Sequence, residues 1–145
     1  MHRISRSAAL LIIVAMAALA GCSRSPAAPA PPSPPAHVAV GHHGAVSVVL
    51  TALGAQQVGI RTAVAVRVGR GRQAMVPYSA LLYQPDGSSV IYAVTGPLTY
   101  TLVPVAVASI QGDQVSLTGL APGTTVVTVG GEELLGVQDG VGVQT

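Results

Sequence analysis

The sequence has few of the side chains that carry catalysis. It contains no lysine, one cysteine and four histidines, and the cysteine and all the histidines precede residue 45. From residue 45 onward the titratable side chains are five acids, four arginines and the tyrosines. These residue types provide no nucleophile–base set, glycine-rich phosphate loop or metal-ligand spacing. We therefore expect a protein that is not an enzyme and has no cofactor.

Tryptophan and phenylalanine are also absent, and only 8% of the residues are charged. The formal net charge of +2 includes Arg3 and Arg6, which lie in a segment that we expect to be removed. The five arginines that remain balance five acidic residues, so the mature chain is formally neutral. A neutral chain gives no reason to expect a nucleic-acid partner.

Residues 1–21 have the pattern of a lipoprotein signal peptide. Two arginines form a positive n-region, and residues 8–19 form an apolar run that is short for a transmembrane helix. The sequence Leu-Ala-Gly-Cys at residues 19–22 resembles the bacterial lipobox, in which Cys22 is acylated and becomes the new N-terminus. The alternative is an ordinary secretory signal with an incidental cysteine. The lipobox predicts a chain that is lipid-anchored at the cell membrane, on its extracytoplasmic face.

Residues 22–44 are expected to form a linker, rich in proline and alanine in its first part. This composition favours an extended tether, which spans about 3 Å per residue where it is polyproline-II. The linker also contains His37, His42 and His43. These are either metal ligands or incidental polar residues. The second interpretation is favoured, because a stable metal site needs three or four rigidly held ligands and this stretch has the composition of an unfolded linker.

Residues 45–136 show the patterns of short β-strands. Alternating or β-branched runs cover residues 46–50, 60–68, 76–83, 90–94, 98–110, 115–118 and 124–129. Turn residues separate the runs, as in Pro122-Gly123, where proline presets φ and glycine accepts a positive φ. The sequence therefore predicts an all-β domain, a small barrel or sandwich of roughly six to eight short antiparallel strands.

Local signals add detail to this prediction. Thr51 is placed to cap a short helix over residues 52–58. A change of phase at Leu102-Val103, beside Pro104, indicates a bulge or an edge position. Glu132 starts one short helical turn.

Beyond the domain, residues 137–145 form a glycine-rich tail that we expect to be flexible.

Within residues 60–68 the valines alternate with a second face made of alanines and arginines. Gly69-Arg70-Gly71-Arg72 is expected to be an exposed hairpin tip. Alternatively, Arg70 and Arg72 contact lipid headgroups or a partner.

Two stretches carry a resemblance to a known family. Residues 115–136 combine a strand, a Gly-Leu-Ala-Pro-Gly turn, a Val-Val strand and a Glu-Glu-Leu-Leu element. Residues 76–94 combine a Val-Pro-Tyr-Ser-Ala-Leu strand, a Pro-Asp-Gly turn and a further strand. In this order and spacing they resemble the C-terminal, membrane-proximal region of periplasmic adaptor subunits, or membrane fusion proteins, of tripartite efflux pumps. The resemblance covers roughly the last half of the chain.

The resemblance implies a part in a transport assembly. In full adaptors this region contacts the inner-membrane transporter, and an α-helical hairpin reaches the outer-membrane channel. This chain passes directly from residues 50–68 to the strand at Val76-Pro77, without the family's lipoyl-like domain or hairpin. We therefore expect an adaptor-like lipoprotein that docks on the extracytoplasmic face of a membrane transporter. The alternative is a stand-alone envelope lipoprotein that binds metal or a small ligand.

Overall fold

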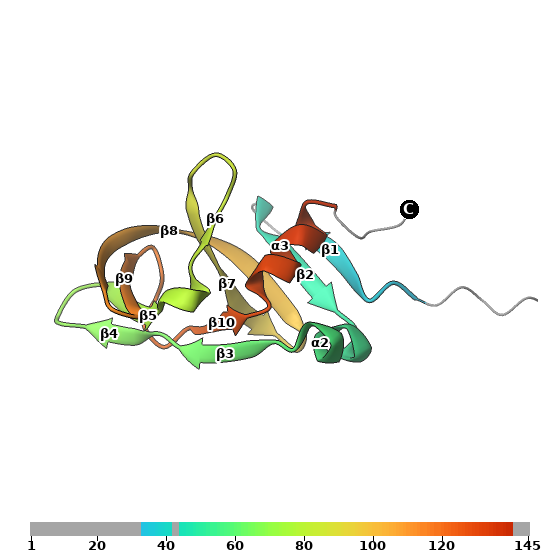
Figure 1. The fold of residues 1–145 in the computed structure, drawn as a ribbon, viewed down its shortest axis with the longest axis horizontal. Coiled ribbons are helices and arrows are strands. Elements are labelled where there is room, and N and C mark those ends of the chain that lie inside the picture. The colour runs from blue at the N-terminus through green and yellow to red at the C-terminus, as the bar shows by residue number, and fades with distance from the viewer. Residues whose placement is uncertain (1–32, 42–43, 141–145) are drawn as a thin grey trace, which may run out of the picture. The chain divides into compact units, whose positions relative to one another are not determined.

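The structure, a computed structural model, describes residues 33–41 and 44–140, which belong to one compact unit that begins at Ser33. Ten strands form one continuous antiparallel sheet in these residues, and the sheet curls into a nearly closed barrel (Figure 1). The strands are β1 (Ala36–Val40), β2 (Val46–Leu50), β3 (Arg61–Val64), β4 (Val66–Val68), β5 (Gln73–Pro77), β6 (Leu82–Tyr83), β7 (Ser89–Gly96), β8 (Thr99–Gln111), β9 (Gln114–Thr118) and β10 (Thr125–Val129). The prediction of an all-β, barrel-like fold is confirmed.

The barrel follows the strand order β3-β10-β7-β8-β9-β5-β4. Strands β3 and β4 are consecutive in the chain and are separated only by Ala65. The Ala65 N–H donates to the carbonyl oxygen of Thr124 at 2.8 Å, and the Ala65 carbonyl accepts from the Gly123 N–H at 2.7 Å. The first and last strands of the order thus belong to one extended segment, which nearly closes the sheet.

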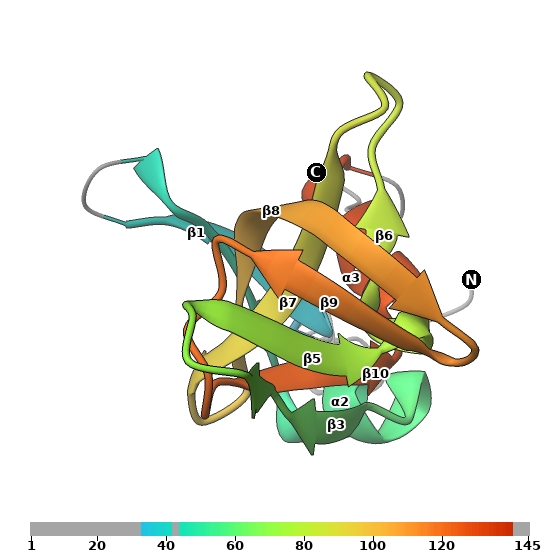
Figure 2. The ribbon, with the colours of Figure 1, turned by 90° about the vertical axis from the view of Figure 1, so that its left-hand side faces the viewer.

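The long strand β8 joins the two halves of the sheet. Its first part pairs with β7 and with β2, and its second part pairs with β9 (Figure 2). Strand β2 pairs in turn with β1, so the β1–β2 hairpin extends the sheet beside the barrel. The register of β8 against β9 shifts between Val107 and Ser109, within the part of β8 that pairs with β9.

Two hydrophobic clusters lie on opposite faces of the sheet. The barrel interior contains Ile91 from β7 and Val126 from β10. The neighbouring residues in those strands, Tyr92 and Val127, point outward into a second cluster that α3 (Gly131–Gln138) covers through Leu134. Strands β7 and β10 are therefore buried on both faces, which is why they read as continuous apolar runs rather than as alternating ones.

The predicted helix after Leu50 is confirmed. Helix α2 spans Ala52–Val58, and the Thr51 side chain caps it by accepting a hydrogen bond from the Gly54 N–H at 3.0 Å. Gly59 ends the helix in the left-handed region, with φ of +66°. The cap and the terminating glycine are local signals, so the sequence alone was sufficient to place this element.

The boundaries of the β domain differ from those expected. Residues 36–40, assigned to the linker, form β1 and pair with β2 along five residues. At the other end, α3 extends to Gln138, two residues into the segment expected to be a flexible tail. Val137 packs against the outer cluster, and this contact explains the longer helix. The residues of the predicted signal peptide lie outside the described residues.

At Leu102-Val103 the sequence predicted a bulge or an edge position. The bulge is absent, because the β7–β8 register is regular from Val90 opposite Pro104 to Tyr92 opposite Leu102. The edge position is confirmed, because β8 pairs with β2 only up to Thr101 and with β9 only from Ala106, so residues 102–105 pair with β7 alone. The carbonyl oxygen of Pro104 lies close to Gly119, on the side of β8 that faces away from β7. The N–H and C=O of one strand residue point to the same side. The missing N–H of Pro104 therefore removes no hydrogen bond to β7, and the strand continues.

Candidate functional site

The β4–β5 hairpin places two arginines at one end of the barrel. Arg67 pairs with Ala74, and Val68 pairs with Gln73. Ala74 is fully buried in the barrel interior, and directly opposite residues of an antiparallel pair share a face of the sheet. Arg67 is therefore on the inward face at the barrel rim. Arg72 lies in the turn immediately before β5 and also lines the cavity at this end of the barrel.

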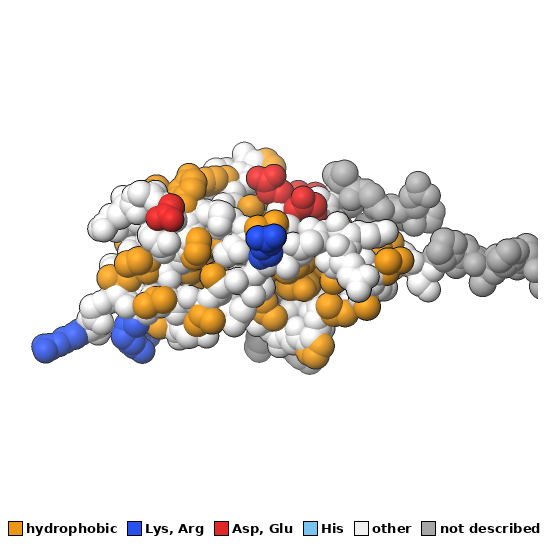
Figure 3. Space-filling model, turned by 60° about the horizontal axis from the view of Figure 1, so that its bottom comes forward, with side chains coloured by type: hydrophobic (Ala, Val, Ile, Leu, Met, Phe, Trp, Pro, Cys, Tyr) orange, Lys and Arg blue, Asp and Glu red, His pale blue; other side chains and the backbone are white. Residues whose placement is uncertain are grey.

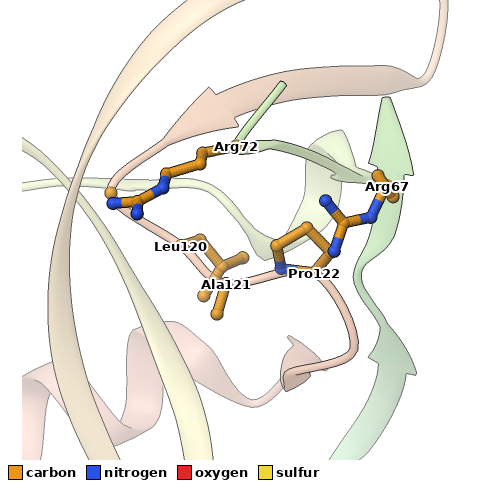
Figure 4. A pocket seen from close by; sticks show the side chains of 6 residues that line it. Arg67, Arg72, Leu120, Ala121 and Pro122 are labelled. Atoms are coloured by element: carbon orange, nitrogen blue, oxygen red, sulfur yellow. The ribbon is translucent and has the colours of Figure 1, made fainter. Parts of the chain in front are cut away.

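A cavity of about 540 Å³ opens between these arginines. It is lined by Arg67, Arg72 and residues 119–122, which connect β9 to β10. Figure 4 shows the two guanidinium groups on either side of Leu120, Ala121 and Pro122. Leu120 is only 4% exposed and belongs to the interior cluster, so it closes the barrel below the cavity.

Local turn chemistry shapes the floor of this cavity. The Thr124 N–H donates to the carbonyl oxygen of Ala121 at 3.2 Å, which closes a turn over Pro122 and Gly123. Gly123 has a φ of +89°, as the sequence predicted for this turn. At Gly119, with φ of +92°, a Cβ atom would lie 3.0 Å from the Pro104 carbonyl oxygen. The close approach of the connection to β8 thus requires a glycine.

The charged residues that line the cavity are all positive. No acidic residue lines it, and the hairpin carries three arginines between positions 67 and 72. Figure 3 shows basic side chains at this end of the unit, apart from the acidic side chains on the same face. Arg67 donates one hydrogen bond, from Nη1 to the Gly71 carbonyl oxygen at 3.3 Å. A guanidinium has five N–H donors, so this bond orients the group and leaves most donors for a ligand.

The structure separates the two arginines singled out in the sequence. Arg72 lines the cavity, whereas Arg70 is exposed in the loop and is not part of the lining. Arg67 was not proposed as a site residue. The signal that identifies it is its place in the alternation of residues 60–68, on the face that includes Ala65, which is buried in the barrel interior.

The histidines do not form a metal site in the part of the chain that the structure describes. His37 is exposed on β1, opposite Val49. His42 and His43, like Cys22, lie outside the described residues. Among residues 33–41 and 44–140, no group of three or more His, Cys, Asp or Glu side chains is placed to hold a metal ion.

The acidic residues mostly have structural explanations. Asp86 accepts a hydrogen bond from the Ser88 N–H at 2.8 Å within the β6–β7 turn, and its hydrogen bonds to Ser88 lower the pKa of the carboxyl. Glu132 and Glu133 are exposed in the first turn of α3, where negative charge is favourable. Neither pattern provides an acid–base pair.

A partly buried hydrogen bond between side chains links α3 to β7. The Tyr92 hydroxyl donates to Gln138 Oε1 at 2.9 Å. Burial, and secondarily the charge of Asp139, raises the pKa of Tyr92 well above its usual value. The phenol therefore remains protonated in the folded protein and serves as a donor that holds α3 in place.

Comparisons with other proteins add no assignment. No family model, curated protein or solved structure matches this chain. Within the described residues, none of the helices is long and apolar enough to span a membrane. The function is therefore inferred from the residues and geometry of the chain itself.

Proposed function

We propose that the protein is a non-catalytic, adaptor-like lipoprotein that docks on the extracytoplasmic face of a membrane transporter in an efflux or related transport system. The observation that carries this proposal is the adjacency of the two stretches that resemble adaptor subunits. Val76, at the start of the first stretch, pairs with Val115, at the start of the second, where β5 lies beside β9. Strand β7 likewise pairs with β10. The two stretches, which residues 95–114 separate, thus form neighbouring strands of one barrel, and this arrangement supports the proposal.

The chemistry of the cavity supports binding rather than catalysis. Its two charged residues are arginines, whose guanidinium groups donate hydrogen bonds and accept none. The rest of the lining is glycine and apolar side chains, so among residues 33–41 and 44–140 no nucleophile lines the cavity with the arginines. Such a surface suits recognition of an anionic group on a partner. In this proposal Arg70 and Arg72 contribute to that contact.

Tethering makes a small interface sufficient. The proposed anchor is acylated Cys22, followed by a proline-rich arm that spans about 3 Å per residue. The tether confines the domain to the neighbourhood of its anchor, so docking becomes an effectively intramolecular event. The effective concentration of the domain at a nearby transporter then reaches the millimolar range. A domain with a weak interface therefore remains associated with a transporter in the same membrane.

The test is crosslinking in intact membranes followed by affinity purification of the tagged protein and identification of its partners. We expect a transporter subunit to be recovered, and we expect deletion of the gene to reduce efflux. Mass spectrometry of the mature N-terminus should find an acylated Cys22. Repeated recovery without any transporter subunit, together with unchanged efflux, would refute the transport function.

A further inference from the structure

We propose that the barrel mouth, defined by Arg67, Arg72 and residues 119–122, is the docking site for an acidic peptide segment of the transporter. This inference rests on the proposed function and names the surface and the chemistry through which docking occurs. The segment would place a carboxylate between the two guanidinium groups and an apolar side chain on the cavity floor.

The first argument is uncompensated positive charge. Arg67 and Arg72 face a common cavity that is lined by no carboxylate, and Arg70 adds a third charge in the same loop. The turn that contains Asp113 lies beside the C-terminal end of β5, because Gln114 pairs with Pro77. Arg72 precedes the N-terminal end of the same strand. At about 3.3 Å per residue, the length of β5 separates the two by more than a Debye length at physiological salt. Asp113 therefore does not compensate the positive charge at the mouth.

The second argument is the geometry of the arginines. Arg67 comes from β4 and Arg72 from the turn before β5, and Figure 4 shows their guanidinium groups on different sides of the mouth. Arg67 is oriented by its hydrogen bond to the Gly71 carbonyl. Guanidinium forks bind carboxylates through paired, charge-assisted hydrogen bonds, which makes a carboxylate the matching ligand group.

The third argument is the apolar surface around the charges. Leu120, Ala121 and Pro122 form the floor between the two guanidinium groups. Apolar area beside a pair of arginines suits a peptide in which acidic and apolar residues are neighbours, and it disfavours a small inorganic anion, which gains nothing from the floor.

The fourth argument favours a protein over the lipid surface. Figure 1 shows β1, at the N-terminal side of the unit, and the β4–β5 hairpin at opposite ends of the long axis of this view. In the proposed function the tether joins the unit at its N-terminal side. When that side is nearest the bilayer, the barrel mouth points away from it, toward the extracytoplasmic part of a transporter.

The direct test measures binding of a defined probe to the full mature chain in non-ionic detergent. The probe is a synthetic peptide rich in glutamate and leucine, titrated by calorimetry at low salt. The control peptide has glutamine in place of every glutamate. We expect the acidic peptide to bind, the control peptide not to bind, and added salt to weaken the affinity.

Variants assign the binding to the barrel mouth. The double variant Arg67→Gln/Arg72→Gln should weaken binding of the acidic peptide by about tenfold or more, since it removes the charge-assisted hydrogen bonds to the carboxylate. The matched control is Arg61→Gln, which removes an exposed arginine from the start of the same strand segment. It should leave the affinity unchanged. Circular dichroism of each variant verifies that the fold is retained.

Other outcomes overturn the inference. Equal binding by the double variant and the wild type would place the contact elsewhere. If the unacylated Cys22→Ser chain binds phosphatidylglycerol vesicles through Arg67 and Arg72 and ignores the peptide, the mouth is a lipid-headgroup site. If the double variant still recovers the transporter from membranes as well as the wild type does, the docking surface is wrong while the proposed function stands. Loss of the transporter from the wild-type purification instead refutes the proposed function.

Discussion

Replacing Gly54 by alanine sets helix propensity against tertiary packing. In a helix interior, alanine is more favourable than glycine by about 1 kcal/mol. In this fold, however, a Cβ at position 54 would overlap the carbonyl oxygen of Pro35 and would lie 3.1 Å from its carbonyl carbon. Because the obstacle is backbone, no rotamer change relieves the overlap. The two effects predict opposite signs for the change in stability.

The magnitude follows from the contacts that the overlap disturbs. The Pro35 carbonyl oxygen accepts hydrogen bonds from the Thr51 N–H at 2.9 Å and from the Thr51 hydroxyl at 3.2 Å. Forcing an extra methyl into a packed site costs about 1–3 kcal/mol, and a weakened hydrogen bond costs about 1 kcal/mol more. After the propensity gain of about 1 kcal/mol is subtracted, we expect a net destabilisation of about 1–3 kcal/mol.

The assay is urea unfolding followed by far-UV circular dichroism, with Gly71→Ala as the matched control. Gly71 does not have a positive φ, and the nearest atom to its added Cβ is 3.9 Å away. The control should therefore be neutral or more stable by up to about 1 kcal/mol. A Gly54→Ala protein as stable as the wild type would refute the close packing of α2 against the residues before β1.

Two further predictions concern titration and metal binding. Tyr92→Phe removes the hydrogen bond to Gln138 and should cost about 1 kcal/mol at neutral pH. Because burial raises the pKa of Tyr92 in the folded state, the unfolded chain loses this proton first. The free energy of unfolding should therefore fall as pH rises above about 10, by up to about 1.4 kcal/mol per pH unit. In the Tyr92→Phe variant the free energy of unfolding should fall less steeply with pH. Equal slopes in urea unfolding between pH 9 and 11 would contradict this. Calorimetry with zinc and copper should detect no micromolar binding; binding that disappears when the three histidines of residues 37–43 become alanine would favour the ligand-binding alternative.

Only part of the candidate site could be predicted from the sequence. Arg70 and Arg72 stand out because they flank Gly71 in a charge-poor chain. Arg67 becomes part of the same site only when Arg67 pairs with Ala74 and the connection at residues 119–122 folds across the barrel end. That connection is about fifty residues away in the chain, and local sequence patterns do not predict which distant segments come into contact.

The local elements of this protein follow from its sequence by itself. Thr51 and Gly59 delimit α2, Pro122-Gly123 makes its turn, and most of the alternating runs become strands. The run predicted at residues 76–83 is an exception, because a 3-10 helix at Tyr78–Ala80 separates β5 from β6. These features depend on backbone dihedrals and on side-chain hydrogen bonds within a few residues, so neighbouring residues are enough to specify them.

Tertiary structure alone decided which faces are buried. In residues 60–68 the exposed face carries Val64 and Val66, and the barrel interior receives Ala65. Larger residues from the other strands, such as Ile91 and Leu117, already fill that interior, so only a small side chain fits opposite them. The formation of strand β1 depends likewise on long-range contacts. Strand β1 pairs with β2, and β2 in turn pairs with β8, about fifty residues later in the chain. Burial is a property of the closed barrel, and a strand's own alternation defines two faces without determining which one points inward.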